Sequence, residues 1–289
     1  MASTTSNRSL PLTDNSSAIT PADVFDCRRM SLIRYLLLKI QIHMSWRKYR
    51  ERYVGRIFRL GPKAIIKIGP LSEAQAMDFV AKNTNIPVPR ILSVFTAKGE
   101  VHIVMEYIRA PLLHDCWEIM SWEQRKSIVV QLRDFILQLR ALTPLHPGKI
   151  HAAGGVEFGL YDPRQQNKPF GPFKTVDQFH EFTGVNYLRQ HIDEYPAFQS
   201  AFEKCAERTY STKFSHGDLA PHNVMVQDGK VVCIIDWECA GWYPEYWEYT
   251  SCFRSNDLYT SFWDMMKEEM EPYPDELEID HCLSGVFLR

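Results

Sequence analysis

The sequence predicts an α+β fold in which a small, β-rich N-terminal part is followed by a mostly helical second half. Up to about residue 107, short β-rich runs alternate with helical segments in the order helix, two strands, helix, two strands. After Pro111 the apolar residues recur at helical spacing, first over residues 122–142. No internal repeat is visible.

Composition places the chain among globular proteins with a large core. Its 289 residues are 45% hydrophobic, 12% aromatic and 24% charged, which excludes disordered and fibrous classes. Lys and Arg number 33 and Asp and Glu 35, so the formal net charge is −2 and no long-range field draws the whole surface to nucleic acid or to an anionic membrane. Binding to either would need a local patch, and we expect neither as a partner.

The chain shows no sign of secretion or of a membrane span. Its seven cysteines are scattered and odd in number, without a CxxC pair, which favours a reduced, cytoplasmic location over a disulfide framework or a zinc site. Residues 1–22 lack a basic segment followed by an apolar one, and we expect a flexible tail there. Residues 32–44 are too short and too interrupted by charge to cross a bilayer, which predicts a soluble amphipathic helix.

The N-terminal elements follow from turn and cap signals. A helix is predicted over residues 31–50, then strands over 55–60 and 63–68 that are separated by the turn pair Gly61-Pro62. Ser72 and Gln75 have the spacing of a capping box, which predicts a helix from Ser72 to about Asn83.

Two further strands complete this part. Pro87 and Pro89 force an extended segment. Strands are predicted over 91–95 and 101–107, joined by a turn at Lys98-Gly99.

The second half begins with a helix over residues 122–142. The Gly- and Pro-rich stretch at 147–175 is too long for an ordinary connection and indicates an ordered functional loop. Further helices are predicted at about 176–193, 197–209 and 256–270.

The segment from Phe214 to Glu238 carries the chemistry. Asp228-Gly229 lies between two apolar β-branched runs, which predicts a tight hairpin that pairs Gln227 with Lys230. Counting back along both strands places Asn223 opposite Ile234, so Asn223 and Asp236 are expected on one face. Their oxygen atoms suit a hard cation such as Mg²⁺. Asp218, five residues before Asn223, is expected nearby in a loop, where it can accept the proton of a substrate hydroxyl.

At this point the chain resembles the aminoglycoside phosphotransferase and choline kinase branch of the protein-kinase-like fold, in particular its fungal members. The patterns H-G-D-L-x-x-x-N and I-D-W-E appear as His216 to Asn223 and Ile235 to Glu238. The resemblance covers roughly Gly55 to Tyr259. It implies a two-lobed fold: an N-lobe at 23–107 that binds nucleotide, and a C-lobe at 108–289 with the catalytic loop and the acceptor site.

The resemblance also implies how ATP is held. Lys67 matches the strand lysine that binds the α- and β-phosphates, and Glu73 is the nearest match to its helix glutamate. Glu106 and Ile108 match the linker between the lobes, whose backbone groups bind adenine. Transfer of the γ-phosphoryl group to the hydroxyl of a small molecule is the function implied, with Asp218 as base and with Asn223 and Asp236 holding Mg²⁺.

One departure keeps an alternative open. No G-x-G-x-x-G loop precedes Lys67, so a pseudokinase that binds nucleotide or a partner without catalysis is the second reading. Arg56 and Arg59 could replace that loop as phosphate partners, or belong to a solvated basic face. A protein kinase is disfavoured, because no D-F-G to A-P-E activation segment follows Asp236.

The acceptor side is less specific. Aromatic residues alternate with acidic ones after Asp236, as a wall for an amine-bearing alcohol would require, although packing in the core explains such residues equally well. The aromatic residues are Trp237, Trp242, Tyr243, Tyr246, Trp247 and Tyr249, and the acidic ones are Glu238, Glu245 and Glu248. Four histidines lack the spacing of metal ligands and are expected to be ordinary histidines, either at the surface or capped by a partner. They are His151, His180, His191 and His222.

Overall fold

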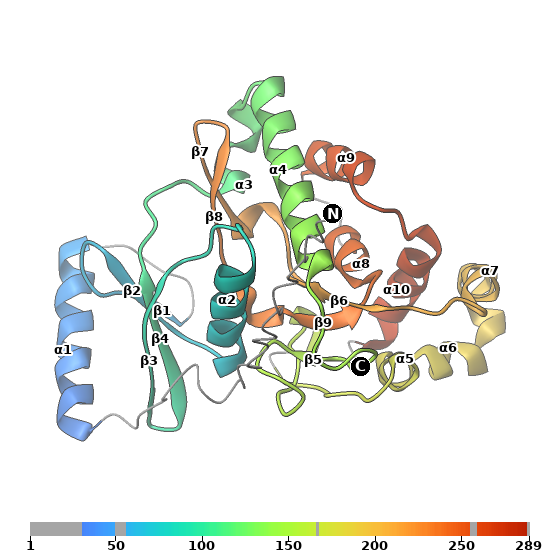
Figure 1. Ribbon diagram of the computed structural model, residues 1–289, viewed down its shortest axis with the longest axis horizontal. Coiled ribbons are helices and arrows are strands. Elements are labelled where there is room, and N and C mark those ends of the chain that lie inside the picture. Colours follow the sequence, from blue (N-terminus) through green and yellow to red (C-terminus); the bar gives the residue numbers. More distant parts are fainter. Residues whose placement is uncertain (1–30, 50–55, 166–167, 255–258, 288–289) are drawn as a thin grey trace, which may run out of the picture.

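The computed structural model describes residues 31–49, 56–165, 168–254 and 259–287. The tail expected at residues 1–22 lies outside these described residues. A four-stranded sheet with two helices forms one end of the molecule, and helices dominate the rest (Figure 1). The predicted α+β class is confirmed.

The N-terminal sheet is antiparallel, with the strand order β1-β2-β4-β3. Its strands are β1 (Ile57–Arg59), β2 (Ala64–Ile68), β3 (Ile91–Ala97) and β4 (Glu100–Glu106). Helix α1 (Leu32–Tyr49) packs on one face against Ile66 and Phe95, and α2 (Leu71–Asn83) lies on the other side, toward the helical part. Because side chains alternate along a strand, Ile66 faces α1 while Lys67 faces the helical part.

The predicted capping box at Ser72 is wrong. Helix α2 begins at Leu71 after Pro70, which adopts an extended conformation and makes no side-chain cap. The hydroxyl of Ser72 is instead buried, and it has no hydrogen-bond partner among the residues that the structure describes. The box occurs in helix α4, where Ser121 and Gln124 bond each other's backbone N–H groups. The Ser-x-x-Gln spacing occurs at both places and does not by itself show where the helix begins. Ser121 directly precedes α4, whereas α2 begins one residue before Ser72, after a proline.

The C-terminal part contains helices and two small sheets. The helices are α3 (Leu113–Cys116), α4 (Trp122–Ala141), α5 (Val176–Thr183), α6 (Val185–Gln190), α7 (Pro196–Cys205), α8 (Trp247–Phe253), α9 (Thr260–Glu269) and α10 (Pro274–Phe287). One sheet has the order β5-β9-β6, and β7 and β8 form a hairpin. These strands are β5 (His151–Ala152), β6 (Thr212–Ser215), β7 (Val224–Gln227), β8 (Lys230–Ile234) and β9 (Gly241–Pro244).

Two predicted helices differ in detail. The segment expected as one helix over residues 176–193 is two helices, because Gly184 adopts φ +99° and ends α5 before α6 begins. The helix expected at 256–270 begins at Thr260 within the described residues. The stretch at 147–175 is ordered by β5 and by isolated bridges, of which Ile150–Phe173 is one.

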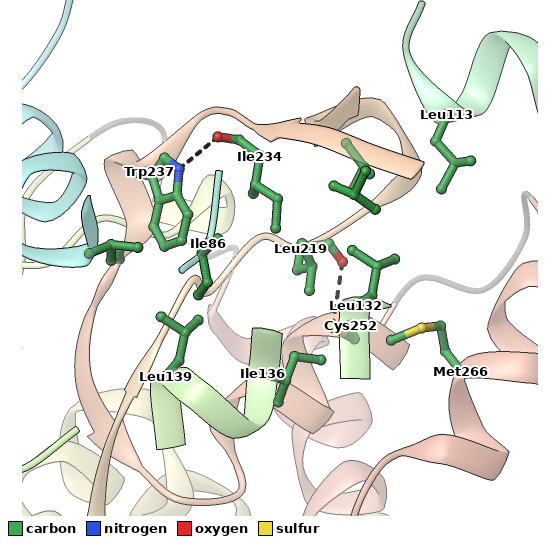
Figure 2. Packing of buried hydrophobic residues seen from close by; sticks show 14 of the residues in the cluster. Ile86, Leu113, Leu132, Ile136, Leu139, Leu219, Ile234, Trp237, Cys252 and Met266 are labelled. Atoms are coloured by element: carbon green, nitrogen blue, oxygen red, sulfur yellow. Dashed lines mark hydrogen bonds between the residues drawn. The ribbon is translucent and has the colours of Figure 1, made fainter. Parts of the chain in front are cut away.

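One hydrophobic cluster joins both parts of the molecule. It contains α2 residues such as Met77 and β4 residues such as Met105, together with the inward face of α4. Figure 2 shows how α4 side chains, among them Leu132 and Ile136, meet the residues that flank the β7–β8 hairpin. This shared core holds the sheet and the hairpin in one arrangement.

None of the helices in the described ranges is both long enough and apolar enough to span a lipid bilayer.

Candidate active site

Lys67 connects the N-terminal sheet to the end of the β7–β8 hairpin. Its Nζ lies 2.9 Å from Oε1 of Glu73 and 2.6 Å from Oδ1 of Asp236. Burial would lower the pKa of the Lys67 ammonium, but three surrounding carboxylates outweigh burial and raise that pKa above its ordinary value. Lys67 therefore remains cationic. The structure brings these three residues together: Lys67 lies on β2, Glu73 on α2, and Asp236 two residues after the end of β8.

Glu238 is the third carboxylate at this point, and the sequence predicted for it only a place among the acidic residues of an acceptor wall. Its Oε2 lies 3.3 Å from Nζ of Lys67. Oxygen atoms of Glu73, Asp236 and Glu238 all lie within 4.8 Å of one another, a spacing that could hold a metal ion. Lys67 is the one cation that the described residues pair with this cluster, so three carboxylates face a single positive charge. Hard oxygen ligands with an excess of negative charge fit a divalent cation such as Mg²⁺.

Asp218 lies in the loop between β6 and the hairpin, and Asn223 holds it. The Nδ2 group of Asn223 donates to the backbone carbonyl of Asp218 at 2.8 Å and to its Oδ2 at 3.1 Å. Burial, together with the nearby charge of Asp236, raises the pKa of Asp218 to about 7. The side chain is still 32% exposed, so a bound molecule can reach it. A carboxylate with this pKa is suited to accept a proton near neutral pH.

The predicted register of the hairpin is wrong beyond its first two pairs. Gln227 pairs with Lys230 as expected, but a shift between Met225 and Val226 places Val224, and not Asn223, opposite Ile234. Asn223 belongs to the 3₁₀ turn Pro221–Asn223 that precedes β7. A bulge adds one residue to a strand, and a count along the sequence cannot detect it.

Asn223 and Asp236 nevertheless lie at the same end of the hairpin. The backbone N–H of Ile235 donates to the carbonyl of Asn223 at 2.9 Å. Because Asp236 follows Ile235 directly, this hydrogen bond holds Asp236 close to Asn223. Asp236 adopts φ +64°, a left-handed conformation, two residues after the end of β8 and directly before the 3₁₀ turn Trp237–Cys239. Helix α2, which carries Glu73, lies against this turn.

The loop that carries Asp218 is anchored by buried polar groups. Oε2 of Glu248 in α8 accepts the backbone N–H of His216 at 2.6 Å and that of Gly217 at 3.3 Å. Gly217 adopts φ +79°, and a Cβ at this position would lie 2.8 Å from the carbonyl oxygen of Cys239. The glycine of the H-G-D pattern is therefore required by both its backbone conformation and its close neighbour.

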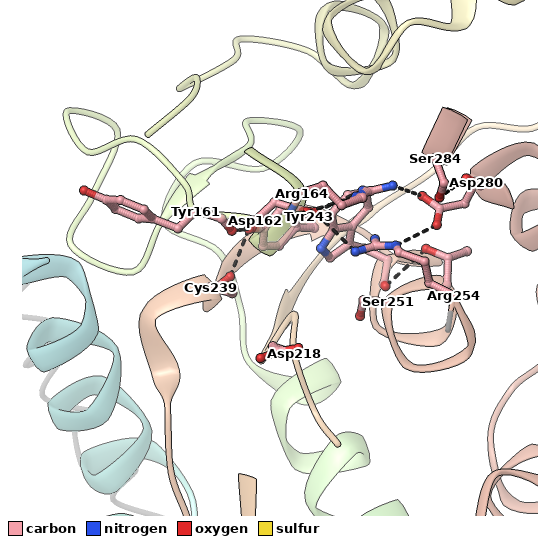
Figure 3. A network of polar contacts seen from close by, with 12 residues as sticks. Tyr161, Asp162, Arg164, Asp218, Cys239, Tyr243, Ser251, Arg254, Asp280 and Ser284 are labelled. Atoms are coloured by element: carbon pink, nitrogen blue, oxygen red, sulfur yellow. Dashed lines mark hydrogen bonds and ion pairs between the residues drawn. The ribbon is translucent and has the colours of Figure 1, made fainter. Parts of the chain in front are cut away.

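Beside this loop, a buried cluster of ion pairs joins three distant segments (Figure 3). Arg164 pairs with Asp162 at 3.0 Å and with Asp280 at 3.1 Å, and Arg254 pairs with the same two carboxylates. The cluster ties the stretch at 147–175 and α10 to the end of α8. The charge of Arg254 also lowers the pKa of Asp218, against the larger effect of burial.

Glu106 and Ile108 lie where β4 leaves the N-terminal sheet. Glu106 is the last residue of β4, and its N–H donates to the carbonyl of Arg90 at 2.9 Å. The N–H of the intervening Tyr107 donates to the carbonyl of Lys63 at 3.0 Å. The segment is thus held at the edge of the sheet.

Arg56 and Arg59 take different positions. Arg56 is exposed and pairs with Glu100. Arg59 is buried, donates to the carbonyls of Gly61 and Pro62, and stacks on the ring of Tyr107 at 3.1 Å. The solvated interpretation is therefore wrong for Arg59, because its guanidinium holds the β1–β2 turn.

The aromatic residues after Asp236 are core residues. All six are buried, with exposures of 0% to 8%. Tyr243 stacks on Trp247 with ring centroids 4.9 Å apart, and Trp237 donates to the carbonyl of Ile234. Packing explains their burial, although Tyr246 and Trp247 also line a cavity of about 710 Å³ beside α5, α6 and α10.

The histidines have mixed surroundings. His151 is buried, and its Nδ1 lies 2.8 Å from the carbonyl of Ala152. His180 bonds the hydroxyl of Tyr246 at 2.8 Å, and His191 bonds the carbonyl of Tyr187. His222 is exposed beside Asp218, with 4.0 Å between Nε2 and Oδ2.

Comparison with solved structures shows which fold this is. Aminoglycoside phosphotransferase APH(4)-Ia superposes with a TM-score of 0.58 at 12% sequence identity, over 84% of this chain and 88% of that chain. The streptomycin–ATP–APH(2'')-IIa ternary complex superposes with a TM-score of 0.54 at 12% identity, over 87% and 85% of the two chains. The fold is therefore the kinase-like fold of aminoglycoside phosphotransferases. No curated protein matches the chain.

The sequence itself matches a family. The profile described as "Phosphotransferase enzyme family" aligns with residues 43–272, a range that includes Lys67, Asp218, Asn223 and Asp236. This match extends over most of the chain, and the fold agrees with it. The chain belongs to the phosphotransferase enzyme family.

Proposed function

We propose that this protein is an ATP- and Mg²⁺-dependent kinase that phosphorylates a hydroxyl group of a small molecule. The observation that carries the proposal is the position of Lys67, which contacts both Glu73 and Asp236 at the end of the hairpin that begins beside Asp218. A cation, a cluster of carboxylates and a carboxylate with a pKa near 7 are the groups that phosphoryl transfer needs in one place.

In the proposed reaction, Asp218 accepts the proton of the acceptor hydroxyl as its oxygen attacks the γ-phosphorus of ATP. The bond from that phosphorus to the bridging oxygen breaks, and the products are a phosphate monoester and ADP. Lys67 neutralises charge on the α- and β-phosphates. Asn223 and Asp236 would hold Mg²⁺, with Glu238 beside them, and the ion would supply further neutralisation of phosphate charge.

Nucleotide is proposed to lie between residues 23–107 and residues 108–289, against the segment Glu106–Ile108. The N–H of Glu106 is already engaged with Arg90, so its carbonyl oxygen would accept from adenine and Ile108 would provide the donor. This mode of binding uses backbone atoms, and it is independent of the side chains at both positions.

Amine-bearing polyols are the first acceptors to test, because solved neighbours were crystallised with streptomycin, gentamicin and hygromycin B. Release of ADP and the mass of the product would be followed with pools of aminoglycosides, amino alcohols and sugars. We expect Mg²⁺-dependent transfer that Asp218→Asn reduces at least about a thousandfold.

The matched control is Asp228→Asn, which changes a carboxylate at the tip of the same hairpin, away from the site. Equal turnover by wild type and Asp218→Asn would contradict the proposal. Stabilisation by ATP without turnover in any pool would instead favour the non-catalytic, nucleotide-binding reading.

A further inference from the structure

Helix α1 exposes a stripe of large apolar side chains. Within the described residues, twelve large hydrophobic side chains are exposed, and six of these belong to this one helix. The six, named here the α1 stripe, are Leu32, Ile33, Leu36, Leu37, Ile40 and Met44, with exposures between 53% and 72%. Soluble proteins expose single apolar residues routinely, but a contiguous group of this kind indicates a contact surface.

Among the described residues, the side chains that hold α1 to the protein are not those of the α1 stripe. Tyr35, Leu38 and Ile42 pack against the sheet beside Ile66 and Phe95. At 3.6 residues per turn the six stripe residues occupy an arc of about 140° opposite that packing face. The helix therefore has two apolar faces, and the fold accounts for one of them.

Basic residues accompany the stripe. The helix sequence contains Arg34, Lys39, Arg47 and Lys48, and it contains no Asp or Glu. Arg34, Lys39 and Arg47 are exposed. Since the whole chain has a net charge of −2, this positive charge is local to α1.

We infer that α1 docks on an anionic membrane surface, lying flat with its stripe inserted at the boundary between headgroups and acyl chains. An apolar arc flanked by Lys and Arg is the pattern of interfacial helices. The helix does not span a bilayer. A second copy of this chain is a poorer occupant, because pairing α1 with itself would oppose cations with cations.

The position of α1 suits such docking. It forms the outer edge of the molecule, on the far side of the sheet from α2 and at the end opposite α5, α6 and α7 (Figure 1). The inference is independent of the proposed function, because it concerns neither Lys67 nor the hairpin. The overall charge of the chain predicts no membrane partner unless a local patch exists, and α1 provides such a patch.

Vesicle flotation with the full chain tests the inference. We expect binding to phosphatidylcholine vesicles that contain phosphatidylserine, and little binding to pure phosphatidylcholine. Leu36→Ser/Ile40→Ser should lower the partition coefficient at least about tenfold, because it removes two inserted side chains. Leu137→Ser is the matched control, because Leu137 is 55% exposed but lies on α4. This variant should bind vesicles as wild type does.

Charge variants separate the two contributions. Arg34→Gln/Lys39→Gln should weaken binding to the anionic vesicles about tenfold or more, and a rise in salt concentration should also weaken it. Lys126→Gln/Lys230→Gln, which removes two positive charges elsewhere, should have little effect. Circular dichroism would verify that each variant is folded.

Two results would overturn the inference. One is a vesicle result: either wild type does not bind anionic vesicles, or the stripe variant and the charge variant both bind them as tightly as wild type does. The other is a concentration-dependent dimer in light scattering that Leu36→Ser/Ile40→Ser abolishes without any vesicle binding by wild type, which would assign the α1 stripe to a second copy.

Discussion

Glu248 accepts the backbone N–H of His216 at 2.6 Å, across 32 residues of sequence. Its carboxylate is buried, 2% exposed, and burial raises its pKa to about 7. The same oxygen accepts the N–H of Gly217. One side chain of α8 therefore satisfies two buried donors in the loop that presents Asp218.

Replacing Glu248 should damage both stability and turnover. Glu248→Ala leaves two buried N–H groups unpaired, which we expect to lower the free energy of unfolding by about 2–4 kcal/mol. Because the loop positions Asp218, turnover should fall more than about tenfold. Urea unfolding and steady-state kinetics measure the two effects.

The controls for this prediction lie close by. Glu248→Gln keeps an oxygen acceptor, so it should lower the free energy of unfolding by less than about half the amount expected for Glu248→Ala. Glu245→Ala, three residues away, removes a carboxylate that bonds Ser211 near the surface and should leave turnover unchanged. If Glu248→Ala had the stability and turnover of wild type, the anchoring role would be wrong.

Lys67 and Glu73 should be coupled in stability but not in turnover. Lys67→Met removes the cation beside a glutamate that is 2% exposed, which we expect to lower the free energy of unfolding by about 3 kcal/mol. Adding Glu73→Gln removes the buried charge and should restore most of that loss. Turnover should remain below about 1% of wild type in both, because phosphate charge is no longer neutralised.

A double-mutant cycle from urea unfolding measures this coupling. Lys82→Met/Asp78→Asn, at an exposed pair on the same helix α2, should show coupling of less than about 1 kcal/mol. Recovery of turnover along with stability would mean that Lys67 acts through the fold alone.

The order of the elements was predictable because it depends on local signals. The turn at Gly61-Pro62, the apolar periodicity of residues 122–142 and the pair Asp228-Gly229 each act within a few residues. The structure has the expected strands and α4 at these places. The break at Gly184 escaped notice because the apolar pattern continues across it, although the glycine itself was a visible signal.

The site was predictable only where the sequence carries a pattern. His216 to Asn223 and Ile235 to Glu238 mark the hairpin, and the resemblance led to Lys67. Glu248 and Arg254 act across the fold, and nothing in their local sequence distinguishes them from other charged residues. Glu238 stood within a quoted pattern, but its contact with Lys67 depends on the left-handed conformation of Asp236.

Glu238 should contribute to metal affinity. Its carboxylate lies with those of Glu73 and Asp236, and removing one of three charges weakens the attraction for a divalent cation. We expect Glu238→Gln to raise the Mg²⁺ concentration for half-maximal turnover about tenfold, with a smaller effect at saturating Mg²⁺. Asp236→Asn should abolish turnover at every Mg²⁺ concentration.

A Mg²⁺ titration of turnover measures this directly, and Glu157→Gln provides a control in the stretch at 147–175. An unchanged Mg²⁺ requirement in Glu238→Gln would mean that Glu238 pairs with Lys67 and does not contribute to metal affinity.

His216 should make the protein sensitive to acid. Its ring is fully buried, and burial lowers its pKa from 6.5 to about 4. Nδ1 accepts the N–H of Asp218 and Nε2 lies 3.1 Å from the carbonyl of Ile235, so the ring is neutral with its proton on Nε2. Protonation of Nδ1 would remove the acceptor for Asp218.

The sign of the effect follows from these pKa values. Between pH 6.5 and pH 4 the unfolded chain binds a proton at His216 and the folded chain does not, so acid favours unfolding over this range. The contribution is fully retained above pH 6.5 and is lost as the pH falls. From pH 7 to pH 5 the loss is about 2 kcal/mol.

Other buried acids titrate as well, so the comparison must be between variants. The free energy of unfolding of wild type minus that of His216→Gln should fall by about 2 kcal/mol between pH 7 and pH 5. Proton NMR of the His216 ring in wild type provides a second measurement that does not require the variant to fold. A constant difference between the variants, or a ring that titrates near pH 6.5, would show that His216 is free to protonate in the folded protein.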